Sequence, residues 1–201
     1  MDQVKDHATD EAMLERRAAI AALLARRPDD LLVVPGLGST TYDLASLGDD
    51  ERNFYLWGAM GGAAMIGLGL ALARPDRRVA VITGDGEMLM GIGSLATIAL
   101  QAPKNLAVIV FDNRHYGETG MQESHTARAV DLPAVARGCG FSCAFDVADA
   151  RGLSDLAAQL TGFSELFFAR VRIAANEPPR VLPLRDGVEL KKRFRRAIGA
   201  G

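Results

Sequence analysis

The segment from Val79 to Asn113 constrains the fold of this chain more than any other part. An apolar run at residues 79–82 leads directly into Gly84-Asp85-Gly86, and a second apolar run at 106–111 leads into Asp112-Asn113. Asp85 and Asn113 are 28 positions apart (113 − 85), a distance that accommodates one helix and one strand. Because neighbouring parallel strands end at the same edge of a sheet, we expect both side chains to lie there.

The rest of the chain alternates between apolar runs and helical patterns in the same way. This alternation is typical of an α/β fold with a doubly wound parallel sheet, and 201 residues are enough for a single domain spanning 1–201. The predicted strands cover residues 31–34, 79–82, 106–111, 142–147 and 166–173. The predicted helices cover 10–27 (with Thr9 or Asp10 as N-cap), 41–47, 59–73, 93–101, 132–137, 153–160 and a basic helix at about 188–198.

Three loops follow predicted strands directly, at residues 35–40, 84–86 and 112–119. Ligands of open α/β sheets bind at the carboxyl ends of the strands, so we expect these loops to converge on one site. A carboxylate from Asp85, an amide oxygen from Asn113 and a loop carbonyl near His115 would suit a magnesium-bound diphosphate. The sequence lacks Gly-x-Gly-x-x-Gly after a strand and Gly-x-x-x-x-Gly-Lys-Ser/Thr, the signatures of dinucleotide-binding and P-loop proteins.

Charge and hydropathy argue against other classes of partner. The formal net charge is −2, which gives no basic excess for binding nucleic acid. Residues 56–73 run for 18 positions without a charge but contain five glycines, so we predict a glycine-rich loop and a buried helix rather than a membrane span. The N-terminus has no signal-peptide core. Cys139 and Cys143 have no further metal ligands nearby, so we expect buried thiols in a cytoplasmic protein.

The chain also resembles a known family. Gly84-Asp85-Gly86 together with Asp112-Asn113 is similar to the signature of thiamine diphosphate enzymes, in their diphosphate-binding module. Three longer blocks resemble the β subunit of the sulfopyruvate decarboxylases and the matching half of the phosphonopyruvate decarboxylases. These blocks are NFYLWGAMG (53–61), GDGEMLMGIGSLATIA (84–99) and DNRHYGETGMQESHT (112–126).

The resemblance implies roles for individual residues. Asp85, Asn113 and the main-chain oxygen of His115 match the magnesium ligands, and Met60 matches the bulky apolar residue that holds the cofactor bent. The other residues that match cofactor-contacting loops are Ser39, Gly58, Gly84, Gly86, Glu87, Tyr116, Gly117, Glu118 and Thr119. Many family members have a small hydroxyl residue in place of Glu87. We therefore expect its side chain to turn away from the diphosphate or the residue to act only through its backbone N–H.

The activity implied by the resemblance is non-oxidative decarboxylation of a 2-oxo acid with a sulfonate or phosphonate at C3, dependent on thiamine diphosphate and Mg²⁺. Met60, His115, Gln122 and His125 are the candidate catalytic residues. Only the diphosphate-binding module matches, so the glutamate that activates the cofactor would come from a separate pyrimidine-binding (α) subunit in a hetero-oligomer. Three alternatives remain: a carboligase similar to acetolactate synthase, a non-catalytic regulatory subunit, and an oxidative 2-oxo acid:ferredoxin enzyme.

Overall fold

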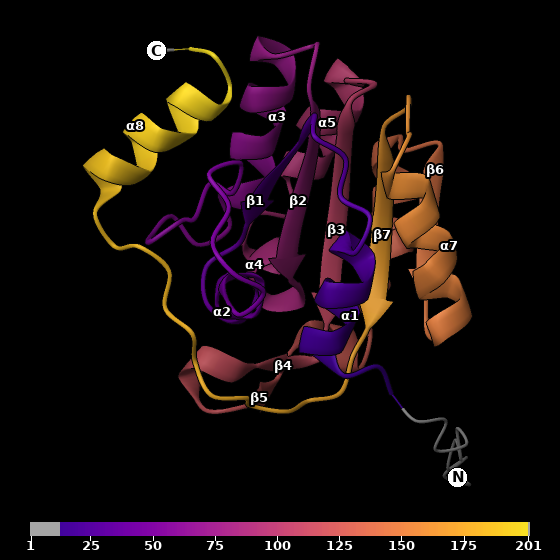
Figure 1. Cartoon of the computed structure of the whole chain (residues 1–201). Helices are drawn as coiled ribbons and strands as arrows, with labels where there is room; N and C mark the ends of the chain where they lie inside the picture. The colour runs from indigo at the N-terminus through magenta and orange to yellow at the C-terminus, as the bar shows by residue number, and fades with distance from the viewer. Residues whose placement is uncertain (1–12, 201) are drawn as a thin grey trace, which may run out of the picture.

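A five-stranded parallel β-sheet forms the centre of the molecule (Figure 1). The computed structural model describes residues 13–200. All neighbouring strands are parallel, so their carboxyl ends lie at one edge. The predicted α/β class with a parallel sheet is confirmed. The strands, in the spatial order β1-β2-β3-β7-β6, are β1 (Leu31–Pro35), β2 (Arg78–Gly84), β3 (Leu106–Asp112), β7 (Phe167–Arg172) and β6 (Cys143–Val147).

Helices cover both faces of this sheet, which is why its central strands are almost wholly apolar. Every residue of β1 and β3 is buried. One apolar core lies between the sheet and α1 (Arg16–Leu24), α2 (Ser39–Ala45) and α7 (Ala150–Leu160). The other lies between the sheet and α3 (Ala63–Ala73), α5 (Ser94–Gln101) and α6 (Leu132–Cys139). The short helix α4 (Asp85–Met90) follows β2 directly, and α8 (Gly187–Ala197) is the last helix.

Two helices begin later than their sequence pattern predicts. The proposed caps Thr9 and Asp10 lie outside the described residues; α1 begins at Arg16, where the Glu15 carboxylate accepts hydrogen bonds from the next turn. The helix predicted from residue 59 begins at Ala63, because Ala59 (φ 58°) and Gly61 (φ 86°) adopt left-handed conformations that an α-helix excludes. Ala59 and Gly61 instead belong to the turn that precedes α3.

The loop after β3 contains structure that the sequence pattern did not predict. Within residues 114–126, β4 (His115–Tyr116) pairs antiparallel with β5 (Gln122–Glu123), and a 3₁₀ turn (Gly117–Thr119) connects them. Strands of two residues are too short to produce a recognisable alternation of apolar and polar residues. The hairpin lies beyond the carboxyl edge of the sheet (Figure 1).

After β7 the chain crosses this same edge before it reaches α8, as Figure 1 shows. Leu14 and Ile173 form a parallel bridge, which brings the start of α1 to the end of β7. Further along, the Trp57 indole N–H donates to the Leu184 carbonyl oxygen at 2.8 Å. No helix in the described part of the chain is long and apolar enough to cross a membrane. Cys139 and Cys143 are free and half-buried, so the expectation of buried thiols was too strong.

Candidate functional site

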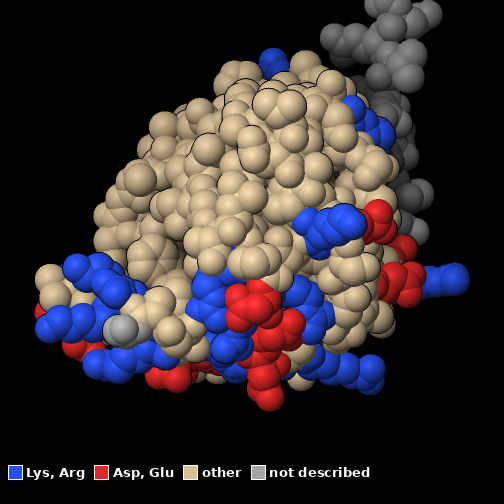
Figure 2. Space-filling model, turned by 90° about the horizontal axis from the view of Figure 1, so that it is seen from above, with Lys and Arg blue, Asp and Glu red and all other residues tan. Residues whose placement is uncertain are grey.

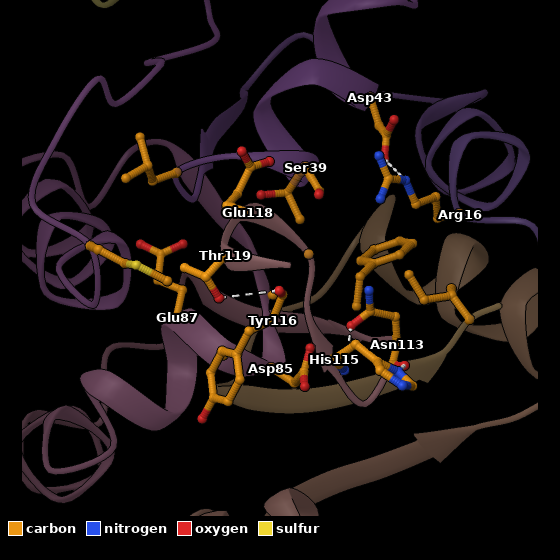
Figure 3. A pocket seen from close by; sticks show the side chains of 18 of the residues that line it. Arg16, Ser39, Asp43, Asp85, Glu87, Asn113, His115, Tyr116, Glu118 and Thr119 are labelled. Atoms are coloured by element: carbon orange, nitrogen blue, oxygen red, sulfur yellow. Dashed lines mark hydrogen bonds and ion pairs between the residues drawn. The ribbon is translucent and has the colours of Figure 1, made fainter. Parts of the chain in front are cut away.

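A pocket that is partly open to solvent lies at the carboxyl edge of the sheet. It is formed where the loops after β1, β2 and β3 converge, as the sequence predicts. Figure 3 shows these side chains around the cavity. Most of the residues proposed from the sequence line it: Ser39, Met60, Gly84, Asp85, Gly86, Glu87, Asn113, His115, Tyr116, Gly117, Glu118 and Thr119.

Three proposed residues do not line the pocket. Gly58 is exposed, in the turn before α3. The Gln122 side chain bonds to Thr119, accepting from its hydroxyl at 2.9 Å and donating to its carbonyl at 2.9 Å. His125 Nδ1 lies 2.9 Å from the Tyr116 hydroxyl. The hairpin turns Gln122 and His125 back onto their own loop, where they support residues that do line the pocket.

Asp85 is the most strongly perturbed acid of the pocket. Its side chain is almost fully buried, and the Ser124 hydroxyl donates a hydrogen bond to Oδ2. Thr126 Oγ1 lies 3.2 Å from the same oxygen and 2.7 Å from Oδ1 of Asp112. Burial raises the pKa of Asp85 to about 6; the nearby Asp112 carboxylate adds to this increase, and the two hydroxyl groups oppose it. A cation beside Asp85 would relieve the cost of its buried charge.

Asn113 presents its amide in a tightly folded local turn. Oδ1 accepts the His115 backbone N–H at 2.9 Å, while the Asn113 carbonyl oxygen lies 2.8 Å from His115 Nδ1. Within residues 13–200, no group of three or more His, Cys, Asp and Glu side chains is arranged to hold a metal ion. The hard oxygens of Asp85 and Asn113 nonetheless fit Mg²⁺, because this ion usually takes few protein ligands and completes its coordination with phosphate and water.

Glu87 is buried rather than directed into solvent. Its Oε2 accepts the Thr83 hydroxyl at 2.8 Å, and the backbone N–H groups of Gly61, Ala63 and Leu37 face the carboxylate. Burial raises the pKa of Glu87, although the Thr83 hydrogen bond opposes this increase. The side chain lines the pocket, and these contacts hold its carboxylate against the surrounding loops.

Two glycines of the central motif serve different purposes. A Cβ on Gly84 would meet nothing within 4 Å, so a ligand can approach its backbone closely. A Cβ on Gly86 would lie 2.6 Å from the Tyr116 ring. Gly86 is therefore required for packing against the hairpin, rather than for open space beside a ligand.

Sequence reasoning missed one ion-paired cluster in the pocket wall. Arg16 of α1 and Asp43 of α2 both line the cavity, and Arg16 Nε lies 2.8 Å from Asp43 Oδ2. Burial raises the pKa of Asp43, whereas Arg16 and Arg17 oppose the increase. No local motif marks these residues, because α1 reads as an ordinary amphipathic helix. The supporting hydroxyls of Ser124 and Thr126 were missed for a similar reason.

Comparison with known proteins identifies the family. The family model for "Thiamine pyrophosphate enzyme, C-terminal TPP binding domain" matches residues 36–166. The chain is 42% identical over 178 residues to phosphonopyruvate decarboxylase of Streptomyces hygroscopicus, covering 88% of this chain and 41% of that protein. It is 36% identical over 186 residues to sulfopyruvate decarboxylase subunit beta of Methanococcus maripaludis, covering 90% and 97%.

The fold comparison agrees with the sequence comparison. Benzoylformate decarboxylase from Polynucleobacter necessarius superimposes with a TM-score of 0.69 at 18% identity, over 88% of this chain and 36% of that chain, which shows a shared fold. The chain spans less than two thirds of several curated relatives, including the Streptomyces enzyme. The resemblance stated from the sequence is confirmed. The chain belongs to the thiamine pyrophosphate enzymes, and residues 36–166 correspond to their C-terminal TPP-binding domain.

Proposed function

We propose that this chain is the diphosphate-binding (β) subunit of a cytoplasmic, thiamine diphosphate- and Mg²⁺-dependent 2-oxo acid decarboxylase. Its substrate would be 3-sulfopyruvate or 3-phosphonopyruvate, and its products the corresponding aldehyde and CO₂. The names of its relatives support this reaction. In this proposal, residues 1–201 form one domain.

The observation that carries the proposal is that Asp85 and Asn113 lie in the same pocket. The two residues follow the adjacent strands β2 and β3 and line one pocket. In this proposal, the Asp85 carboxylate, the Asn113 amide oxygen and the His115 main-chain oxygen would hold Mg²⁺. The open backbone at Gly84 would let a diphosphate approach closely.

The remaining pocket residues are proposed to orient the cofactor and to shield it from water. Met60 is 40% exposed despite being a large apolar residue, so its side chain is available to pack under the cofactor. The neighbouring apolar side chains of Leu37, Phe111 and Ile173 line the pocket and exclude water from it. When bound, thiamine diphosphate supplies the electron sink for decarboxylation.

Loop residues complete this assignment. We assign Ser39, Gly86, Glu87, Tyr116, Gly117, Glu118 and Thr119 to the cofactor-binding loops, with Gly58 at their margin. His115 is the pocket residue proposed to meet the substrate. Gln122 and His125 hold the hairpin through Thr119 and Tyr116.

A separate pyrimidine-binding (α) subunit is the proposed partner, and it would supply the catalytic glutamate. Relatives named "subunit beta" support a two-subunit enzyme. Helix α3 contains no charged residue, and its outer side exposes Met65 and Leu72, at 41% and 51%. Figure 2 shows a broad face of the molecule with almost no Lys, Arg, Asp or Glu. Such a surface suits burial against another subunit.

The decisive experiment measures CO₂ release by this chain, alone and mixed with its pyrimidine-binding subunit. Thiamine diphosphate and Mg²⁺ are supplied, and sulfopyruvate, phosphonopyruvate and pyruvate are offered in parallel. We expect activity only in the mixture, with one C3-acidic substrate preferred over pyruvate. Asp85→Ala is expected to abolish Mg²⁺-dependent cofactor binding in the mixture.

Other outcomes would redirect the proposal. Cofactor binding without CO₂ release from any substrate, combined with coupling of pyruvate to an added aldehyde, would indicate a carboligase instead. Failure of the mixture to bind thiamine diphosphate would indicate a non-catalytic subunit. Unchanged cofactor binding by the Asp85→Ala variant would refute the assigned metal site.

A further inference from the structure

The charged residues that line the pocket are mostly acidic. Asp43, Asp85, Glu87 and Glu118 are carboxylates, whereas Arg16 is the sole lysine or arginine among the described residues that line it. A diphosphate carries more negative charge than one Mg²⁺ ion neutralises. Glu118 is paired with Arg180 at 3.1 Å, but a further positive charge among the other carboxylates would favour diphosphate binding.

Arg16 is held rigidly at the wall of this pocket. The Leu14–Ile173 bridge and the hydrogen bond from the Ala174 N–H to the Leu14 carbonyl at 2.9 Å fix the chain just before it. The side chain is buried, at 5% exposure, and Nη1 donates to the Asn176 carbonyl oxygen at 3.1 Å. These contacts fix the guanidinium without neutralising it. Figure 3 shows Arg16 on the Asn113 side of the pocket, with Glu87 on the far side.

Asp43 does not cancel the charge of Arg16 alone, because it is shared with a second arginine. Arg17 Nε and Nη2 lie 3.3 and 3.2 Å from Asp43 Oδ1, while Arg16 approaches Oδ2. The three residues together carry one positive charge in excess. Arg17 is more exposed and does not line the pocket, so the member of this cluster that can offer the charge to a ligand there is Arg16.

We propose that the Arg16 guanidinium binds the terminal phosphate of the cofactor's diphosphate, on the Asn113 side of the pocket. Asp43 and the Asn176 carbonyl are positioning groups that orient it. Arginine suits this role because its planar, permanently charged group matches phosphate oxygens. The proposal rests on the proposed function, since it requires a diphosphate in this pocket.

Thiamine monophosphate provides the sharpest probe, because it lacks the terminal phosphate. Titration calorimetry with Mg²⁺ would compare thiamine diphosphate and thiamine monophosphate on the full chain assembled with its pyrimidine-binding subunit. Magnesium pyrophosphate on the full chain alone gives a second readout without the partner. The variants are Arg16→Gln, Arg16→Lys and Arg17→Gln, and the control is Arg151→Gln, an exposed position of α7 outside the pocket.

We expect Arg16→Gln to weaken thiamine diphosphate and pyrophosphate binding about 10- to 100-fold, the usual loss for a charge-assisted hydrogen bond. Thiamine monophosphate binding should be unchanged, Arg16→Lys should recover part of the loss, and Arg151→Gln should bind as the wild type. Arg17→Gln should weaken diphosphate binding less than Arg16→Gln, because Asp43 then pairs with Arg16 alone. Chemical unfolding of each variant separates this effect from a loss of stability.

Three results would overturn the proposal. Equal weakening of both thiamine phosphates would mean that Arg16 only braces α1 against α2. An effect confined to the KM of the C3-acidic substrate would assign Arg16 to the substrate's acid group instead. Wild-type affinities in Arg16→Gln would refute this inference alone, whereas a wild-type chain that binds neither diphosphate would refute the proposed function with it.

Discussion

Replacing Asp85 with asparagine is expected to stabilise the protein without its ligands. Burial raises the pKa of Asp85 from 3.8 to about 6, so ionising this carboxyl costs the folded state about 3 kcal/mol at 1.36 kcal/mol per pKa unit. A raised pKa in the folded acid means that the folded state binds a proton more tightly than the unfolded state. The free energy of unfolding therefore falls as the pH rises through the window between 3.8 and about 6.

Asparagine removes the charge but can still accept the Ser124 hydrogen bond. We expect Asp85→Asn to raise the free energy of unfolding by about 3 kcal/mol at pH 7.5 and by about 1 kcal/mol at pH 4.5. The assay is urea unfolding in EDTA at both pH values, with Asp155→Asn, an exposed position of α7, as the control. The same variant should lose Mg²⁺-dependent binding of thiamine diphosphate.

An equal gain at both pH values would show that the benefit does not come from the buried charge. A loss of stability at pH 7.5 would refute the reasoning altogether, because it would mean that the folded state favours the ionised carboxylate. The control should change the free energy of unfolding by less than about 0.5 kcal/mol at either pH.

Four other substitutions test the site and the elements around it. Ser124→Ala should lower the affinity for Mg²⁺ in the presence of the cofactor about 10- to 100-fold, measured by titration with Mg²⁺. The reason is that the Asp85 carboxylate loses the hydrogen bond that fixes its orientation. Gly36→Ala should lower the free energy of unfolding by about 2 kcal/mol or more in urea, since its Cβ would lie 1.7 Å from Glu87 Oε2. By contrast, Gly69→Ala in α3, where a Cβ meets nothing within 4 Å, should raise it by about 0.5–1 kcal/mol. Met60→Ala should weaken cofactor binding with little change in unfolding, because the side chain is 40% exposed; a large loss of stability would assign it to the core instead.

Much of the architecture could be predicted because its signals are local. The buried strands read as continuous apolar runs, and their predicted spans at 79–82 and 106–111 fall within β2 and β3. The boundaries of helices were harder to predict where residues with left-handed backbone conformations precede the helix. The left-handed Ala59 and Gly61 delay the start of α3, although the apolar pattern predicted a helix from residue 59. The β4–β5 hairpin depends on pairing between residues rather than on a pattern within either strand.

The sequence alone determined the fold class and the meeting of Asp85 with Asn113. Parallel strands joined by helices must end at one edge, so residues after neighbouring strands converge whatever the rest of the chain does. Only the tertiary structure decided which more distant groups join them. Ser124 reaches Asp85 across 39 positions, and Arg16 reaches Asp43 because α1 packs beside α2. Such contacts depend on how helices and loops pack in three dimensions. Residues that meet through packing have no characteristic spacing in the sequence, so no sequence pattern predicts them.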